Sequence, residues 1–330
     1  MANKGVRETV TSELLRKETK KNVRIPYLSG AIRGMGELKF SLGGFIIEMK
    51  STNKDFIDEI ASMIEDIYQS SDIVERFESL HSYTNEYFYC IRIAAERSAD
   101  LLEKCCIVRN KYEFIDNIPD ELLYSIAAKK AFLKALYLSC GFLKVPELNE
   151  DDFDMASHGK NGYTLTFNLN SDIVRDDIVT LISNECLIDA DTIKRKKNGC
   201  GIYLKSGEAI CNVLTFIGAV EGALILFDII SSRKMRNDIN RVNNCDIANI
   251  NKVVDAGTKQ IEAIKILENS GEYEFLGDVI KETCKMRKEY PDIGIKELGN
   301  KFLPPISKSC LNHRLRKIVS LAEEIKNREN

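Results

Sequence analysis

One order of predicted secondary structure occurs twice along the first two thirds of this chain, and it constrains the fold more than any other feature. A helix, two strands, a helix, two strands and a helix follow one another between about residues 25 and 105. The same succession, interrupted by a polar insertion at residues 147–160, follows between about residues 125 and 218. Strand pairs that alternate with helices are typical of an α+β domain. The chain is therefore predicted to contain a duplicated αββαββα scaffold.

Turn residues and hydrophobic patterns set the bounds of these elements. Proline is favoured in the first turn of a helix and glycine just past its end, and short apolar runs are typical of strands. The first copy is predicted to contain a helix from Pro26 to Gly36, strands on either side of Gly43 and Gly44, a helix over 54–69, strands over 73–80 and 87–94, and a helix through Leu102. The second copy is predicted to contain a helix over 125–140, strands over 141–145 and 163–169, a helix over 172–184, strands over 192–197 and 201–205, and a helix over 208–217.

The leading helices of the two copies carry small residues at matching positions, at an offset of 105 residues. Small side chains four residues apart leave a smooth groove along a helix, so two such helices can pack backbone to backbone around a pseudo-two-fold axis. A chance match between two ordinary buried helices is the alternative, and the repeated strand order favours the duplication. The matched positions are Gly30 with Ala135, Gly34 with Ser139, and Gly36 with Gly141.

A different pattern ends the chain, over residues 291–326. It has the outline of a helix-turn-helix that begins at Gly294 and ends at Asn327. The first helix has apolar residues at steps of three and four, and it is predicted to end at two consecutive prolines, which cannot continue a helix. These residues are Ile295, Leu298 and Phe302, followed by Pro304 and Pro305.

The second helix of this motif is predicted to begin after Ser307, whose hydroxyl can accept a backbone N–H as an N-cap. Its apolar residues recur at i, i+4, i+7 and i+11, which places them on one helical face. We expect this stripe to pack into the domain core. Its members are Leu311, Leu315, Ile318 and Ala322.

The opposite face of the second helix carries hydrogen-bond donors and cations. Such side chains suit base edges and phosphates when a recognition helix enters the major groove of DNA. The alternative is the solvated face of an ordinary helical hairpin. The residues predicted to lie near base edges are Ser309, Asn312, His313 and Arg316, and those predicted to contact phosphates are Lys308, Arg314 and Lys317.

The charge distribution favours a DNA contact at the C-terminal end. Residues 229–330 contain 19 Lys and Arg against 15 Asp and Glu, whereas residues 1–228 contain 28 against 35. The net charge of −3 at pH 7 argues against electrostatic wrapping of nucleic acid by the whole chain. Any DNA contact is therefore expected to be local.

An asparagine-rich segment over residues 229–255 precedes the helix-turn-helix. Asparagine is poor inside a helix because its amide competes for backbone partners, so its frequency here indicates a task for the amides. Two tasks stay open: contact with phosphates, or an interdomain hydrogen-bond seam, which the position between two domains favours. The residues concerned are Arg233, Arg236, Asn237, Asn240, Arg241, Asn244, Asn249 and Lys252.

Several classes of protein are excluded by composition. No apolar run follows Lys4 and Arg7, so no signal peptide is predicted. The most apolar window, residues 213–230, contains Glu221 and Asp228 and is predicted to be a buried helix rather than a membrane span. The ten cysteines form no CxxC pair, and with three histidines they form no zinc motif, so they are expected to be reduced core residues of a cytoplasmic protein.

The two leading helices, with Leu28, Gly30 and Gly36 in the first, resemble the paired helices of the LAGLIDADG homing endonuclease family. In that family the helices meet at the pseudo-dimer centre, and an acid near each helix end holds a divalent metal at the scissile phosphate. On that pattern the acidic positions fall on Met35 and Cys140. Hard Mg²⁺ requires oxygen ligands. The resemblance therefore implies the scaffold without a metal site, a cofactor or nuclease chemistry.

The neighbouring residues do not restore the lost acids. Leu138 stands at the other acidic position of the second helix, and Glu37, the nearest surviving acid of the first copy, has Phe142 as its counterpart. Residues 187–191 spell LIDAD literally, but they follow a helix that lacks the small-residue pattern. That match is interpreted as chance.

Beyond residue 228 the resemblance becomes specific to the WhiA family. It rests on SRKMRNDINRVNNCDIANINKVVDAGTKQIEAIKIL and on IKELGNKFLPPISKSCLNHRLRKI. The resemblance implies an N-terminal helical segment over 1–22, a degenerate LAGLIDADG-like domain over 23–228, an asparagine-rich linker or seam over 229–255, and a helix-turn-helix domain over 256–330.

The family resemblance also implies a function. WhiA proteins are regarded as DNA-binding regulators of sporulation, or as proteins linked to cell division and chromosome segregation. We therefore expect a sequence-specific regulator that is not an enzyme, binds double-stranded DNA and resides in the cytoplasm at the nucleoid. An active nuclease is disfavoured by Met35 and Cys140. A scaffold that recruits a regulatory protein partner stays open as the alternative, as does the oligomeric state.

Overall fold

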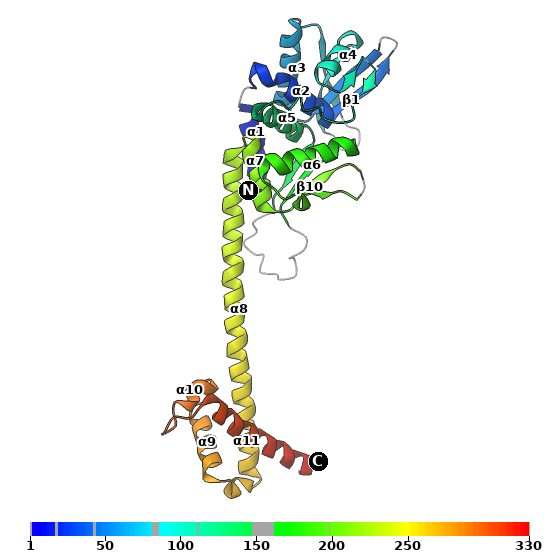
Figure 1. The fold of residues 1–330 in the computed structure, drawn as a ribbon. Coiled ribbons are helices and arrows are strands. Elements are labelled where there is room, and N and C mark those ends of the chain that lie inside the picture. Colours follow the sequence, from blue (N-terminus) through cyan, green and yellow to red (C-terminus); the bar gives the residue numbers. More distant parts are fainter. Residues whose placement is uncertain are drawn as a thin grey trace. The chain divides into compact units, whose positions relative to one another are not determined.

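The computed structural model describes residues 2–16, 19–41, 44–80, 86–110, 112–146, 162–197 and 199–329 (Figure 1). The chain divides into two compact units, Met1–Ser232 and Arg233–Asn330, and the boundary falls inside one helix. The predicted insertion at residues 147–160 lies outside the described residues.

The first copy of the scaffold has the predicted order of elements. Its four strands form an antiparallel sheet in the order β1-β2-β4-β3. Alternate residues of β2, namely Phe45, Ile47 and Met49, are buried and set the core face of this sheet. The elements are η1 (Lys21–Val23), α2 (Arg24–Met35), β1 (Gly36–Ser41), β2 (Gly44–Ser51), α3 (Lys54–Tyr68), β3 (Val74–Leu80), β4 (Tyr87–Ile93) and α4 (Ala95–Lys104).

The second copy repeats this arrangement, which confirms the predicted fold class. Its sheet has the order β7-β8-β10-β9, equivalent to that of the first. A short hairpin, β5 (Val108–Arg109) and β6 (Glu113–Phe114), lies between the copies in sequence. The elements of the second copy are α5 (Ile126–Cys140), β7 (Gly141–Lys144), β8 (Thr164–Phe167), α6 (Asp172–Cys186), η3 (Ala190–Thr192), β9 (Lys194–Arg195), β10 (Ile202–Leu204) and α7 (Gly207–Ile217).

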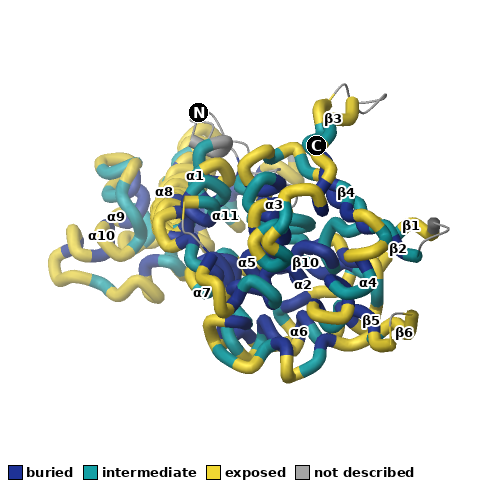
Figure 2. Tube along the Cα trace, turned by 90° about the horizontal axis from the view of Figure 1, so that it is seen from above, coloured by how far each residue is buried: buried dark blue, intermediate teal, exposed yellow. Residues whose placement is uncertain are grey.

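The leading helices α2 and α5 pack directly against each other, and Figure 2 shows much of both as buried. A Cβ atom added at Gly30 would lie 2.4 Å from the carbonyl oxygen of Phe132, and one added at Gly34 would lie 1.9 Å from Ser139 Oγ. Real Cβ atoms do not approach other atoms so closely. The small residues therefore permit the backbone approach that the sequence predicted.

The N-terminal helix α1 (Ala2–Arg16) belongs to the same unit. Its residues Val6, Val10 and Leu14 join the core of the second copy. The Glu13 carboxylate, 9% exposed, accepts the backbone N–H groups of residues 220, 221 and 222 at 3.0, 2.9 and 3.2 Å. These are orphan donors of the first turn of α8 (Val220–Asn269), so α1 supplies that helix with its N-terminal cap.

The predicted helix over residues 208–217 is confirmed as α7 (Gly207–Ile217), but the interpretation of residues 213–230 as one buried helix is wrong. Helix α7 ends at Ile217, and Gly218 follows with φ of 101°, a left-handed conformation that glycine adopts without strain. A new helix, α8 (Val220–Asn269), then begins, with Leu224 61% and Phe227 57% exposed. Among the described residues, no helix is long and apolar enough to cross a membrane.

The ten cysteines are all free, but they are not all core residues. Cys90, Cys105, Cys186 and Cys284 are buried, four others are half-buried, and Cys245 and Cys310 are exposed. Both exposed cysteines lie in helical segments of the C-terminal unit.

The C-terminal unit is helical. It contains the end of α8, η4 (Glu272–Phe275), α9 (Asp278–Glu289), α10 (Ile295–Gly299) and α11 (Lys308–Glu329). Its core combines residues from α8, α9 and both helices of the predicted helix-turn-helix: Ala263, Ile264, Leu267, Cys284, Leu298, Phe302, Leu311, Leu315, Ile318, Ala322 and Ile325.

Candidate nucleic-acid interface

The first helix of the motif, α10, is shorter than predicted. It ends at Gly299, so Phe302 lies beyond it although its side chain is buried, and the helix ends before the two prolines are reached. The backbone N–H of Ile306 donates to Gly299 O at 3.1 Å, and a Cβ at Gly299 would lie 2.6 Å from Ile306 O. The chain therefore turns after Gly299, where the absence of a side chain leaves room for the backbone of Ile306.

The second helix, α11, begins where the sequence predicted. Ser307 Oγ accepts the backbone N–H of Cys310 at 3.2 Å, which is the geometry of an N-cap. The predicted apolar stripe is buried, with exposed fractions of 0 to 2% at Leu311, Leu315, Ile318 and Ala322. Burial of this stripe fixes which face of α11 remains open to a ligand.

That open face carries the residues predicted to contact DNA. Arg314 is half-buried and its guanidinium lies 5.9 Å from the centre of the Phe302 ring, so its stem packs on the flank of the motif. Asn312 is also half-buried at the edge of the face. The exposed members are Lys308, Ser309, His313, Arg316 and Lys317. Their contacts with DNA stay a prediction.

The cations of this face lie in a stretch of sequence without acidic residues. Residues 308–322 contain no Asp or Glu. Over the part of the chain that the structure describes, no ion pair involves Lys308, Arg314, Arg316 or Lys317. Lys308 and Ser309 also lie in the first turn of a 22-residue helix, where the free N–H groups attract anions. The surface is thus suited to the phosphates and base edges of a nucleic acid.

A buried arginine that the sequence pattern did not single out holds this motif in place. Arg287 of α9 is 1% exposed. Its Nε donates to the Gln260 side-chain oxygen on α8 at 2.8 Å, and one terminal nitrogen donates to Tyr290 O at 3.1 Å and Ile293 O at 2.8 Å. The same nitrogen lies 3.4 Å from Pro291 O. The hydrogen bonds of Arg287 therefore stabilise the turn that leads into α10.

The chemistry of Arg287 suits this role. Burial lowers the pKa of its guanidinium, and the nearby Asp292 carboxylate opposes that shift. Arginine nevertheless remains charged in proteins, and its planar group offers five donors in fixed directions. The sequence contained a signal, because Thr283, Cys284 and Arg287 share the buried face of α9 at helical spacing. A cation on a core face requires such a set of acceptors.

The asparagine-rich residues all lie on α8. Arg233 is half-buried, and the remainder are exposed: Arg236, Asn237, Asn240, Arg241, Asn244, Asn249 and Lys252. Arg241 Nη1 lies 3.8 Å from the Asp238 carboxylate one turn away. Neither the phosphate role nor the seam role of this segment is tested by these positions, and both stay predictions.

The ends of α2 and α5, where a LAGLIDADG enzyme carries its acids, show a different chemistry here. Met35 is the last residue of α2, and Cys140, the last of α5, has its pKa raised to about 12 by burial. The Cys140 thiol lies 3.3 Å from Leu136 O. Glu37 forms an ion pair with Lys50. Among the described residues, no group of three or more His, Cys, Asp or Glu side chains is arranged to hold a metal.

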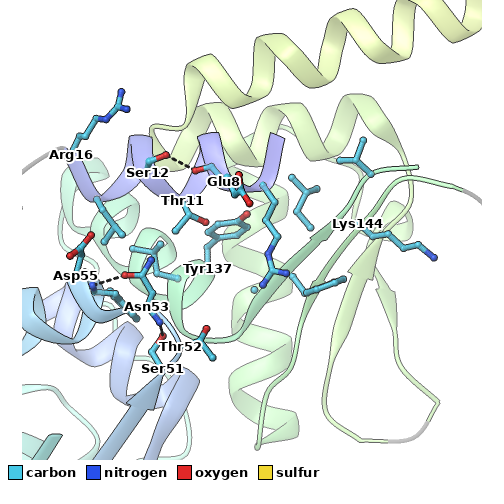
Figure 3. A pocket seen from close by; sticks show the side chains of 18 residues that line it. Glu8, Thr11, Ser12, Arg16, Ser51, Thr52, Asn53, Asp55, Tyr137 and Lys144 are labelled. Carbon is cyan, nitrogen blue, oxygen red and sulfur yellow. Dashed lines mark hydrogen bonds between the residues drawn. The ribbon is translucent and has the colours of Figure 1, made fainter. Parts of the chain in front are cut away.

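A cavity of about 1100 Å³ lies beside the end of α5 (Figure 3). Figure 3 shows Tyr137 directed toward α1, with the β2 to α3 turn on the opposite wall. The Arg7 guanidinium lies 4.6 Å from the centre of the Phe142 ring at this site. The lining mixes three cations, Arg7, Arg16 and Lys144, with two acids, Glu8 and Asp55. It therefore offers neither a dense anion site nor a carboxylate cluster.

The outer face of the first sheet is charged but internally paired. Arg92 Nε lies 2.7 Å from Glu48 Oε1, and Arg92 Nη1 lies 2.9 Å from Glu75 Oε2. Lys39 pairs with Glu48, and Lys50 pairs with Glu37. Three cations and three acids on this face thus neutralise one another, which leaves little attraction for a phosphate backbone.

Comparisons with known proteins match both units. The family model described as WhiA LAGLIDADG-like domain matches residues 25–110 and 129–236, and the model described as WhiA C-terminal HTH domain matches residues 239–322. The chain is 31% identical over 306 residues to the "Probable cell division protein WhiA" of Brevibacillus brevis, covering 92% of this chain and 91% of that protein. The Bacillus cereus protein of the same name is 31% identical over 316 residues, 95% of each.

A solved structure shows the same fold. Full-length DUF199/WhiA from Thermatoga maritima matches with a TM-score of 0.52 and 18% sequence identity, over 96% of both chains. The duplicated scaffold and the helical C-terminal unit are therefore shared along nearly the whole length.

Proposed function

The chain belongs to the WhiA family, and we propose that it is a sequence-specific regulator that binds double-stranded DNA through α11 and acts in cell division and chromosome segregation. The observation that carries this proposal is the open face of α11. Its cations have no acidic partner among the described residues, and a buried stripe and an N-cap hold the helix in place. The names of the relatives support a role in cell division, and the role in chromosome segregation rests on the family resemblance alone.

In this proposal α11 enters the major groove. Ser309, Asn312 and His313 lie near base edges, together with Arg316, whose fork of donors matches the acceptor pair of guanine. Lys308, Arg314 and Lys317 neutralise phosphates. Because three phosphate contacts give only a modest electrostatic affinity, the base contacts of this face determine which DNA sites are occupied.

The test is fluorescence anisotropy on a pool of labelled genomic promoter fragments, with Mg²⁺ present. The wild-type chain is expected to bind a subset of fragments, and the Arg316→Ala/Lys317→Ala variant is expected to lose that binding. A matched variant, Lys265→Ala/Lys285→Ala, removes two exposed lysines from α8 and α9 and is expected to bind nearly as the wild type does. Equal binding by the wild type and the Arg316/Lys317 variant would remove α11 from the interface.

The proposal includes the absence of nuclease activity. Its support is the replacement of both metal-binding acids by Met35 and Cys140, together with the pairing of Glu37 to Lys50. Promoter fragments recovered from the Mg²⁺ binding reaction are expected to be intact on a denaturing gel. Cleavage that depends on Mg²⁺ would contradict this part of the proposal.

Recruitment of a protein partner by the N-terminal unit is the second candidate, favoured by an aromatic cluster. Phe40 is 79% and Tyr112 66% exposed, and both rings lie near the buried Phe45, at 4.5 and 6.1 Å between ring centres. Phe114, 49% exposed, lies 5.6 Å from the same ring. Exposed aromatic clusters are common at protein interfaces. A Phe40→Ser/Tyr112→Ser variant that loses a partner while it retains DNA binding would support this function.

A further inference from the structure

The segment of α8 that precedes the C-terminal core carries an apolar stripe exposed to solvent. Six large side chains form it, and the core of the unit begins only after them, at Gly257. At 100° per residue they fall within one sector of the helix about 140° wide, which is an amphipathic face. Their exposed fractions are 66% for Met235, 52% for Ile239, 60% for Val242, 55% for Ile247, 61% for Ile250 and 45% for Val254.

The same segment has little intrinsic helical stability. Six of its residues are asparagine, which ranks among the weaker helix formers: Asn237, Asn240, Asn243, Asn244, Asn249 and Asn251. A surface helix is normally stabilised by packing of its apolar face rather than by propensity. A helix with weak propensity and an open apolar face therefore needs a partner along that face.

The spacing of the stripe identifies the partner. The steps between the six residues are 4, 3, 5, 3 and 4, which read the same from either end. The centre of this pattern falls between Asn244 and Cys245. Turning a second α8 end over end about that centre places Met235 opposite Val254, Ile239 opposite Ile250, and Val242 opposite Ile247. A two-fold homodimer contact requires this self-complementarity, whereas an unrelated partner imposes no such symmetry.

The polar residues of the sector agree with the antiparallel arrangement. Asn243 and Asp246 lie at the centre of the stripe, and the two-fold operation places the Asn243 amide of one copy opposite the Asp246 carboxylate of the other. The amide can donate to the carboxylate, twice per dimer. A parallel pairing would place Asp246 against its own copy. Arg236, the other polar member of the sector, lies near the end of the stripe, where its long side chain reaches solvent.

The periodicity indicates how two such helices meet. The last residue of the stripe lies 19 positions after the first, in five steps, which gives a mean of 3.8 residues per step. Because this exceeds the 3.6 residues of a helical turn, the stripe winds around the helix in a right-handed sense. Two copies therefore cross and then diverge, so the contact is confined to the six apolar residues and the central polar pair.

We propose that the exposed stripe of α8 is a homodimer interface, in which two copies of the chain pair antiparallel about a two-fold axis between Asn244 and Cys245. The proposal stands or falls independently of DNA binding. Occupation of the stripe by a different protein or by DNA would leave the isolated chain monomeric, so the oligomeric state of the pure protein separates these outcomes.

The experiment is sedimentation velocity on the full chain over a range of concentrations. The wild type is expected to show a monomer-dimer equilibrium. Two charge variants test the contact: Ile239→Glu/Ile250→Glu places like charges opposite each other and is expected to weaken dimerisation by about 100-fold or more. Ile239→Lys/Ile250→Glu places opposite charges together in the antiparallel register and is expected to dimerise at least about 10-fold more tightly than the Glu/Glu variant.

Each outcome decides the proposal. A wild type that remains monomeric at the highest concentration overturns it, and so does a dimer that the Glu/Glu variant leaves intact. Equal dissociation constants for the Glu/Glu and Lys/Glu variants overturn the antiparallel register, because a parallel dimer would place like charges together in both. Circular dichroism on all three chains checks that the variants remain folded. The concentration dependence of the wild type tests dimerisation by itself, even if a variant fails to fold.

Discussion

The outer face of the first sheet and the open face of α11 carry similar numbers of cations, yet they differ in what surrounds those cations. On the sheet, Lys39, Lys50 and Arg92 each contact a carboxylate. On α11, the cations belong to a stretch without acidic residues. A count of basic residues therefore does not distinguish the two surfaces, whereas the pairing of those residues within the folded chain does.

The two surfaces also differ in how they are held. The sheet face is fixed by the hydrogen bonds of its own strands and by its ion pairs. The orientation of α11 depends on the packing of a small helical unit, in which Arg287 fastens the turn before α10. A change at one buried residue is therefore expected to remove the α11 surface while it leaves the sheet intact.

The largest expected effect comes from Arg287→Met, which should destabilise the unit that holds α11 and leave the first sheet unaffected. The variant leaves the Gln260 side chain and the carbonyls of Tyr290 and Ile293 without their buried donor. We expect the free energy of unfolding of the C-terminal unit to fall by roughly 3–5 kcal/mol. Urea denaturation followed by circular dichroism measures this change, and Lys285→Ala, an exposed neighbour on α9, is the control. If the free energy of unfolding falls no further than in the control, the hydrogen bonds of Arg287 are dispensable for stability.

The next effect compares one arginine from each surface. Arg316→Ala is expected to weaken specific DNA binding by about 1–3 kcal/mol, because a bidentate contact to a base is lost. Arg92→Ala removes the same charge from the sheet and is expected to leave affinity unchanged within about two-fold, since exposed paired charges contribute little. Both affinities come from anisotropy titrations at one salt concentration. A similar loss for the two variants would mean that DNA binds both surfaces.

A third change is designed to leave the cations of the sheet unpaired, as those of α11 are among the described residues. Glu37→Gln/Glu48→Gln/Glu75→Gln removes the acids and leaves three cations unpaired. Each cation that then neutralises a phosphate adds a salt-dependent contact, so non-specific DNA affinity at low salt is expected to rise about 10-fold.

The control for this change removes three exposed acids elsewhere in the same unit, with Asp116→Asn/Asp120→Asn/Glu121→Gln. Titrations at two or more salt concentrations separate a new phosphate contact from a general change of net charge, because only the former increases the salt dependence. An equal gain from both triple variants would contradict the role assigned to the ion pairs.

The sequence was sufficient for features that depend on local pattern. Helical spacing placed Leu311, Leu315 and Ile318 on the buried face of α11, and the cap at Ser307 followed from its position before that stripe. The duplication predicted the succession of helices and strand pairs along both copies, whereas the order of the strands within each sheet came from the structure. Whether the polar residues of α11 contact DNA stays a prediction, although the structure brings them together on one face.

The features that the sequence did not reveal depend on residues far apart in the chain. The Glu13 carboxylate caps a helix that begins at residue 220, and no local pattern announces that pairing. Arg287 finds acceptors on α8 and in the following turn only after the unit has folded. The end of a helix at residue 217 was predicted, but the interpretation of residues 213–230 as one buried helix failed, because a single glycine is tolerated in many helices and here the left-handed conformation of Gly218 separates α7 from α8.

The smallest expected effect concerns pH and again separates the two surfaces. The hydrogen bond from Lys39, and then that from Arg92, hold the pKa of Glu48 below its ordinary value, although partial burial opposes them. The unfolded chain therefore binds a proton at Glu48 more readily than the folded chain does, so this contribution to stability is present above the unfolded pKa of about 4.3 and is lost as pH falls below it.

Replacing Glu48 by Gln should lower the urea midpoint of the N-terminal unit at pH 7, and the difference from wild type should shrink by pH 3.5. A difference that stays constant over this range would mean that the Lys39 and Arg92 contacts do not stabilise the carboxylate. The α11 cations have no carboxylate partner among the described residues, so Lys317→Ala should give no comparable dependence of stability on pH in this acidic range.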